Sequence, residues 1–154
     1  MLRTLVAALV FSLYGQANAG LISPQARTEL MQQALIGFWG RSKTPDEQVI
    51  QPANERERKA PPVNQEVVDF AFDVGELSGL SEWCSMDWKL TFTALMRSAR
   101  RNGLNEKQVA FVSVLHGTAQ GAVASAMEKS GPCNQQYRDK LRSQVEGFLS
   151  KEPK

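Results

Sequence analysis

Hydrophobic positions recur at spacings of three and four residues along most of the chain, and no stretch alternates as a β-strand would. Five such stripes are separated by proline, glycine or asparagine, which commonly begin or end helices. Each stripe is the apolar face of an amphipathic helix, which is stable only when it packs against other helices. The pattern therefore predicts an all-α fold, a compact bundle of about five helices.

The first two helices have recognisable beginnings. Ser23 and Pro24 combine an N-cap with proline at the first helical position, and Gly40 is expected to end that helix. Asn64 begins the second helix, whose stripe runs toward Leu77. Ser85 is expected to cap the third helix, which ends at residues 102–103.

The fourth helix, from Glu106 to Lys129, is the most apolar segment outside the N-terminus. Asn105 and Gln108 form a capping box before it, and no formal charge occurs between residues 109 and 127. A helix of this composition is expected at the centre of a bundle. The fifth helix follows Cys133 and carries its charges away from its apolar stripe.

Four glycines interrupt these helices. Gly75 and Gly79 are expected to weaken the end of the second helix, because glycine lowers helix stability. Gly117 and Gly121 are spaced four apart in the fourth helix, which resembles the motif that lets two membrane helices pack closely. We interpret this spacing as close packing against another helix of the same chain.

Residues 40–63 break the helical pattern. They hold four prolines and a charge run from Glu55 to Lys59, and we expect them to form an exposed linker loop. Thr44 to Glu47 has the form of a capping box, which suggests one helical turn inside the loop. The loop is either a tether or a partner-binding segment, and its composition favours the tether.

The first nineteen residues have the layout of a secretory signal peptide. A basic residue precedes an apolar run from Leu5 to Tyr14, and Ala17 and Ala19 are the small residues that a signal peptidase accepts. The run is about half as long as the ~20 residues that span a bilayer. We therefore expect a periplasmic or secreted protein with no membrane anchor after cleavage, and a single helical domain over residues 20–154.

The mature chain is close to charge balance. Loss of the one basic residue in the leader lowers the formal charge from +2 to +1. This value does not favour a nucleic-acid partner, because nucleic-acid-binding surfaces are strongly basic. Arg97, Arg100 and Arg101 form the one basic cluster, and we interpret it as a solvated helix end that the helix dipole favours.

Cys84 and Cys133 are the only cysteines. Their even number in an exported chain predicts a disulfide, which would join the starts of the third and fifth helices. A redox site would need a C-x-x-C motif, and a zinc site would need more ligands than one histidine offers. No phosphate-binding, dinucleotide or calcium motif occurs either, so we expect no metal and no cofactor.

His116 is the only histidine, and Ser113 and Gln120 lie three and four residues away on the same helix. These three side chains could form a polar site for proton transfer or pH sensing. The alternative is a buried histidine bonded to Gln120 or to a carbonyl of another helix. We favour burial, because no carboxylate lies at helical spacing from His116.

Two further sets of residues have a structural and a functional interpretation. Asp69, Asp73 and Glu76 share one helix face, which we interpret as a solvated acidic surface. Trp83 and Trp88 lie on either side of the first cysteine, and we expect them to pack over the disulfide. The alternative is that the tryptophans contact a hydrophobic partner or ligand.

The segment WCSMDW at residues 83–88 is similar to the Trp-x-Cys-Glu-Asp-Phe neighbourhood of the small periplasmic acid-stress chaperones HdeA and HdeB. The separation of the two cysteines and the short helix around residues 137–141 are similar as well, whereas residues 20–80 have no counterpart. The resemblance implies an exported helical protein with one disulfide that binds clients in acid.

These observations favour a non-enzymatic exported protein that binds another envelope or secreted protein, as an accessory, chaperone-like or inhibitory factor. The first alternative is a carrier of a small hydrophobic ligand. The weakest alternative is an enzyme that uses His116.

Overall fold

The computed structural model describes residues 20–151, which form six helices and no strand within that range. The helices are α1 (Pro24–Phe38), α2 (Glu55–Arg58), α3 (Gln65–Trp83), α4 (Lys89–Arg101), α5 (Glu106–Glu128) and α6 (Gln135–Lys151). The predicted all-α class is confirmed, and five of the six helices are those that the hydrophobic pattern indicated. The predicted leader lies outside the described residues.

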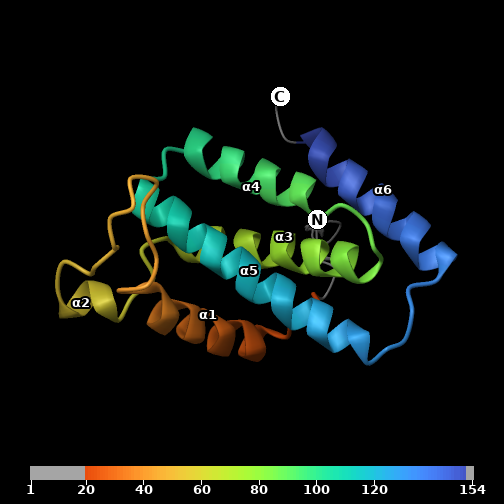
Figure 1. Cartoon of the computed structure of the whole chain (residues 1–154), viewed down its shortest axis with the longest axis horizontal. Coiled ribbons are helices and arrows are strands. Elements are labelled where there is room, and N and C mark those ends of the chain that lie inside the picture. Colours follow the sequence, from red (N-terminus) through yellow and green to blue (C-terminus); the bar gives the residue numbers. More distant parts are fainter. Residues whose placement is uncertain (1–19, 152–154) are drawn as a thin grey trace, which may run out of the picture.

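Helices α3 and α5 pack against each other over most of their length and form the centre of the molecule (Figure 1). Helix α1 covers one side of this pair and α4 the other, while α6 packs mainly against α3 and α4 at one end. The core between them contains large side chains that are less than 2 % exposed, such as Phe38, Phe72 and Phe111. The central position predicted for the apolar fourth helix is that of α5.

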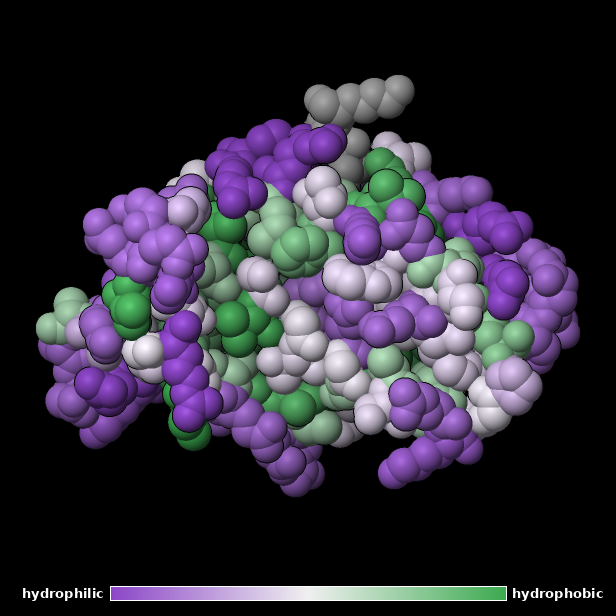
Figure 2. Space-filling view, in the orientation of Figure 1, coloured by the Kyte–Doolittle hydropathy of each residue, from purple (hydrophilic) through white to green (hydrophobic). Residues whose placement is uncertain are grey.

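By length and composition alone, helix α5 could cross a membrane. Of its most apolar stretch of 18 residues, 44 % is buried inside the fold. Core helices of soluble bundles have the same properties. The buried side of α5 contacts α1, α3 and α4, and its other side carries exposed uncharged residues. Figure 2 shows this side as a green and white band with hydrophilic margins.

The capping residues that begin α1, α3 and α5 act as the sequence indicated. The side chains of Ser23, Asn64 and Asn105 each accept a hydrogen bond from a backbone N–H of the first helical turn. Gln108 completes the capping box of α5 by accepting from the backbone N–H of Asn105 at 3.0 Å. Such bonds depend only on residues within one turn, so the local sequence is sufficient to predict them.

The junction between α3 and α4 differs from the prediction. Helix α3 continues past Leu77 to Trp83, and Cys84 is its C-cap. Ser85 does not cap α4: it lies in the left-handed region at φ 55°, and α4 begins only at Lys89. The disulfide therefore joins the end of α3, and not the start of α4, to the segment before α6.

The glycine prediction is also wrong, because the close approach is made by the other pair. A Cβ atom on Gly75 would lie 2.6 Å from the backbone oxygen of His116, and one on Gly79 would lie 2.6 Å from that of Gln120. These two glycines thus let α3 contact the backbone of α5. Gly117 and Gly121 are exposed, with nothing within 4 Å of an added Cβ in the described part of the chain.

The segment between α1 and α3 is mostly exposed but is anchored at several points. Ile50 and Val63 are buried in the core, and the indole of Trp39 donates to the backbone oxygen of Arg58 at 3.2 Å. The helical turn is α2, in the charge run. It is not at Thr44, whose surroundings form a tight turn closed by a bridge between residues 43 and 49.

Candidate functional site

His116 lies in a chain of buried hydrogen bonds that connects α3, α4 and α5. Its Nε2 atom is 2.8 Å from the hydroxyl of Ser78, which is 2.7 Å from the hydroxyl of Thr91. Thr91 in turn donates to the backbone oxygen of Trp88 at 2.7 Å. Ser78 and Thr91 are 0 % exposed and His116 is 1 % exposed. The network therefore satisfies polar groups inside the core, where an unpaired group would be costly.

The surroundings of His116 favour its neutral form. Burial lowers its pKa from 6.5 to about 4, because a charged imidazole is poorly solvated in the core. The rings of Phe92 and Trp88 lie 4.9 and 6.4 Å from the imidazole. Although Ser78 and His116 form a serine–histidine pair, neither side chain is open to a substrate in this structure.

The three residues of the predicted polar site do not act together. Gln120 donates to Glu82 on α3 at 2.8 Å, and His116 is bonded to Ser78 instead of to Gln120 or a carbonyl. Ser113 forms no hydrogen bond with either residue in the described part of the chain and lines a groove between α4 and α5. The expectation of a buried histidine agrees with this geometry, but its partner lies 38 residues away in the sequence.

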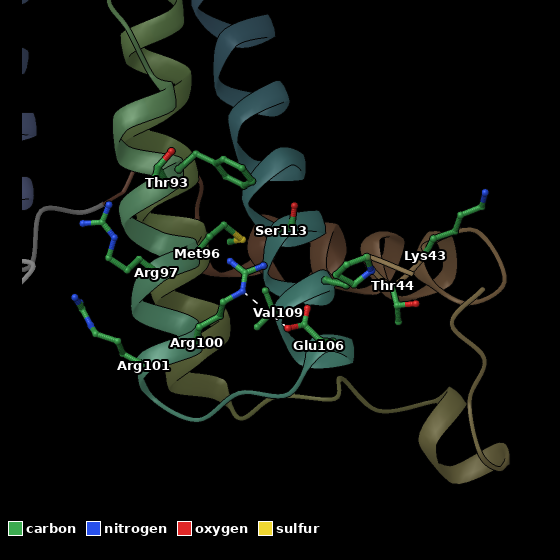
Figure 3. Close-up of a pocket in the computed structure, with 13 residues that line it drawn as sticks. Lys43, Thr44, Thr93, Met96, Arg97, Arg100, Arg101, Glu106, Val109 and Ser113 are labelled. Atoms are coloured by element: carbon green, nitrogen blue, oxygen red, sulfur yellow. Dashed lines mark ion pairs between the residues drawn. The ribbon is translucent and has the colours of Figure 1, made fainter. Parts of the chain in front are cut away.

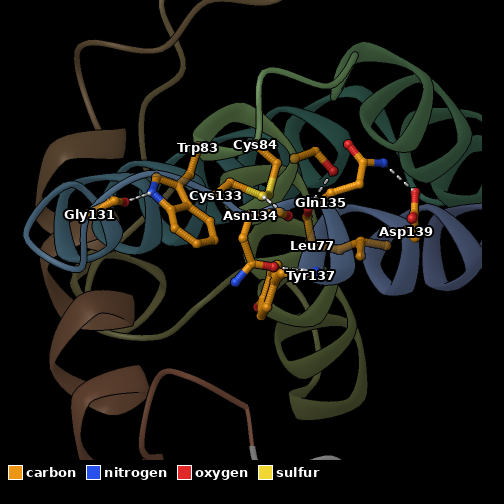
Figure 4. The surroundings of a disulfide bond; sticks show 10 residues. Leu77, Trp83, Cys84, Gly131, Cys133, Asn134, Gln135, Tyr137 and Asp139 are labelled. Atoms are coloured by element: carbon orange, nitrogen blue, oxygen red, sulfur yellow. Dashed lines mark hydrogen bonds between the residues drawn. A yellow bond between two sulfur atoms is a disulfide. The ribbon is translucent and has the colours of Figure 1, made fainter.

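The disulfide and Trp83 form one unit (Figure 4). Cys84 and Cys133 are bonded, with Cα atoms 5.1 Å apart. The indole of Trp83 donates to the backbone oxygen of Gly131 at 2.9 Å and packs edge-on against Tyr137, with centroids 5.3 Å apart. Trp83 therefore fixes the turn that leads into α6. Trp88 is half-buried and packs against Phe92.

The strongest candidate for a binding surface is a groove of about 730 Å³ between α4, the first half of α5 and the loop after α1 (Figure 3). We call it the α4–α5 groove. Its lining residues are Lys43, Thr44, Pro45, Phe92, Thr93, Met96, Arg97, Arg100, Arg101, Glu106, Val109, Ala110 and Ser113.

The floor and the rim of the α4–α5 groove differ in chemistry. The floor is apolar: Met96 and Val109 face each other between the two helices (Figure 3), and Phe92 also lines the groove. At the rim, Arg100 points across the groove toward Glu106, whereas Arg97 and Arg101 extend from the outer side of α4, and Lys43 lies on the opposite side (Figure 3). Arg100 lies 4.0 Å from Glu106 and Lys43 pairs with Glu47 at 2.7 Å, so the basic side chains outnumber the acids that line the groove but are partly compensated.

The groove includes residues for which the sequence analysis favoured a different role. The basic cluster at the end of α4 is exposed, as expected of a solvated helix end, and it also borders an apolar depression. Loop 40–63 contributes one edge through residues 43–45. Neither Trp83 nor Trp88 lines this groove.

A second polar cluster lies where the described chain begins. Arg27 on α1 bonds Asp73 at 2.6 Å and Glu76 at 2.5 Å, and the guanidinium lies 5.8 Å from the ring of Phe72. Asp73 is exposed, but Glu76 is only 6 % exposed. The prediction that Glu76 belongs to a solvated acidic face is therefore wrong, because Arg27 compensates its charge inside the fold.

The comparisons with known proteins return no match to a protein-family model, to a curated protein or to a solved structure. The resemblance to the acid-stress chaperones is thus supported by the residues quoted for it alone. The function must be inferred from the groove, the buried network and the ion cluster of this chain.

Sequence reasoning missed Ser78, Thr91 and Arg27, and misinterpreted Glu76 as solvated, for one reason. Each acts through a partner that is distant along the chain, and periodicity reports only contacts within a helix. One signal was available. Arg27 is the one basic residue of α1, and a half-buried arginine usually has a carboxylate partner.

Proposed function

We propose that the protein is exported and non-enzymatic, and that it binds a protein partner through the α4–α5 groove. The observation that carries this proposal is the combination of an apolar floor with an excess of basic side chains at the rim. The partner segment that fits is acidic and amphipathic, with apolar side chains that reach the floor and carboxylates that meet the arginines.

The chemistry of the lining residues supports this choice. Met96 is flexible and polarizable, so it adapts to apolar side chains of different shapes. Arginine pairs with carboxylates through two parallel hydrogen bonds, and it is enriched among residues that dominate binding energy. Arg97 and Arg100 are both exposed; Arg100 points into the groove beside the floor, and the long side chain of Arg97 would have to turn toward it to meet the same helical segment (Figure 3).

The proposed export agrees with the disulfide. Disulfides persist in the periplasm and outside the cell and are rare in the cytosol. Cys84 and Cys133 are bonded, and the described chain has no free cysteine. The layout of the first nineteen residues supports the same compartment.

A second candidate is a carrier of a small anionic amphiphile, such as a fatty acid. It is favoured by the size of the groove, since ~300–1,000 Å³ is the usual range for ligand pockets. In this case the arginines would hold the head group and the floor would hold the tail.

The test uses the exported protein and two fluorescent helical peptides. The first carries leucine on one face and glutamate on the other, and the second has lysine in place of each glutamate. We expect the acidic peptide to bind, and R97E/R100E to weaken it at least tenfold. The matched control R56E/R142E makes the same charge change at exposed arginines outside the groove and should alter binding little. Equal losses in both variants would refute the groove as the site.

Native mass spectrometry of the purified protein separates the two candidates. A retained fatty acid that R97E/R100E releases would favour the carrier. Binding of the acidic peptide with no retained small molecule would favour the protein partner.

A further inference from the structure

The beginning of the described chain lies directly on the carboxylate of Glu76. The backbone N–H of Leu21 donates to Oε2 of Glu76 at 2.7 Å. A Cβ atom on Gly20 would lie 2.7 and 2.8 Å from the two oxygens of the same carboxylate, and 2.6 Å from Nη2 of Arg27. Ile22 is buried and holds this segment against the bundle. The nitrogen of Gly20, one bond from its Cα, is therefore near Glu76.

The cluster that receives this segment lacks one positive charge. Arg27 is paired with two carboxylates, those of Asp73 and Glu76. Lys140 and Lys151 line the adjacent cavity of about 830 Å³ from α6, but neither forms an ion pair with these carboxylates in the described part of the chain. Arg27 thus shares one positive charge between Asp73, which is exposed to water, and Glu76, which is only 6 % exposed, so a second cation beside Glu76 would be favourable.

We propose that cleavage between Ala19 and Gly20 supplies that cation, and that Glu76 binds the new α-ammonium group of the mature chain. Hydrolysis adds the hydroxyl of water to the carbonyl carbon of Ala19 and its hydrogen to the nitrogen of Gly20. The nitrogen then takes up the proton that the new carboxylic acid releases. A neutral amide next to Glu76 becomes an ammonium group, and two cations now balance two anions.

This inference rests on the export part of the proposed function, because a signal peptidase must make the cut. It adds that processing stabilises the fold as well as removing the leader. It also explains why glycine suits position 20, since any side chain there would meet the guanidinium of Arg27. Cleavage one residue earlier or later would displace the amine by about 3.8 Å.

The stabilisation by the α-ammonium group should depend on pH in a defined direction. While Asp73 and Glu76 on α3 are ionised, we expect their charges to favour the protonated form of the α-amine and so to raise its pKa, against the opposing charges of Arg27 on α1 and of the lysines of α6. The stabilisation is therefore complete below the ordinary pKa of an α-amine and is lost as the pH rises through the raised value.

The experiment expresses the full chain with its own leader and purifies the exported product. Intact mass should show loss of residues 1–19. The α-amine is then acylated at pH 7, and mass spectrometry of the N-terminal peptide gives the rate. Because only the neutral amine reacts, we expect the wild type to react about tenfold more slowly than E76Q. The control E66Q changes an exposed glutamate in the first turn of α3 and should leave the rate unchanged.

The outcomes separate the two proposals. A product that begins at another residue contradicts the cleavage site, and a product that keeps its leader contradicts export. A product that begins at Gly20 but reacts as fast as E76Q contradicts binding by Glu76 while leaving export intact. If E76Q does not fold, D73N takes its place, with a smaller acceleration expected because Asp73 is exposed.

Discussion

Helices α5 and α6 are both amphipathic, but they are attached to the molecule in different ways. Helix α5 contacts α1, α3 and α4, and the glycines of α3 let its backbone approach closely. Helix α6 buries only Leu141 and Val145 fully and is connected through the disulfide before its first turn. The attachment of α5 depends on close packing against α3, whereas that of α6 depends on a covalent bond.

This difference shows where each helix is sensitive to change. Close backbone packing leaves no room for added atoms, so a single methyl group on α3 disturbs α5. A helix that buries little apolar area gains little from packing, so its position depends on the link that keeps it near. Stability should therefore be lost locally around α6 and globally around α5.

The largest effect is expected from removing the disulfide. We expect C84A/C133A to lower the free energy of unfolding by about 4 kcal/mol, because the bond closes a loop of 49 residues. Denaturant unfolding measures this loss. The rate of amide hydrogen exchange should increase in α6 before it increases in α1. An equal increase in all helices would contradict the idea that the disulfide mainly holds α6.

A methyl group at the α3–α5 contact should have the next largest effect. G75A places a Cβ atom 2.6 Å from both the Ala119 Cβ and the backbone oxygen of His116. We expect a loss of about 3 kcal/mol, since overpacking against backbone is hard to relieve. Thermal and denaturant unfolding should agree on the value, and an unchanged stability would show that α5 can move away at little cost.

The buried hydrogen bonds of His116 should make the contact between α3 and α5 sensitive to acid. Because the pKa of His116 is lowered to about 4 in the fold, the unfolded chain binds a proton more readily between pH 6.5 and 4. Stability should be complete above pH 6.5 and should fall by up to about 3 kcal/mol as the pH approaches 4. H116Q should lose this part of the pH dependence, whereas the titration of carboxylates remains in both proteins.

The smallest effect is expected on the exposed side of α5. G117A adds a methyl group where nothing lies within 4 Å in the described part of the chain, so helix propensity should raise stability by about 1 kcal/mol. This variant is the matched control for G75A. A loss that depends on protein concentration would instead reveal a second copy packed on this side.

The local sequence was sufficient to predict what depends on neighbouring residues. The caps at Ser23, Asn64 and Asn105 and the helical periods of the five long helices are examples. Ser85 was misinterpreted because a serine beside a helix has the same appearance whether it caps that helix or occupies a left-handed turn. The cysteine pairing was simple to predict, since two cysteines allow only one bond within a chain.

The candidate site could be predicted only in part, because its properties depend on which helices meet. A GxxxG spacing occurs in both α3 and α5, and only the packing shows that Gly75 and Gly79 make the contact. The arginines of α4 gained a binding interpretation once the apolar residues of α5 were placed beside them. His116 was correctly interpreted as buried, while Ser78 could not be identified from spacing.

The proximity of Trp88 to His116 gives the molecule an optical property. A protonated imidazole quenches indole emission, and these two rings lie 6.4 Å apart with Phe92 against the same imidazole. Trp39 and Trp83 instead donate hydrogen bonds to backbone oxygens elsewhere in the fold. We therefore expect the fluorescence of Trp88 to fall when the buried His116 is protonated, so that it would report the charge of this histidine without an attached label.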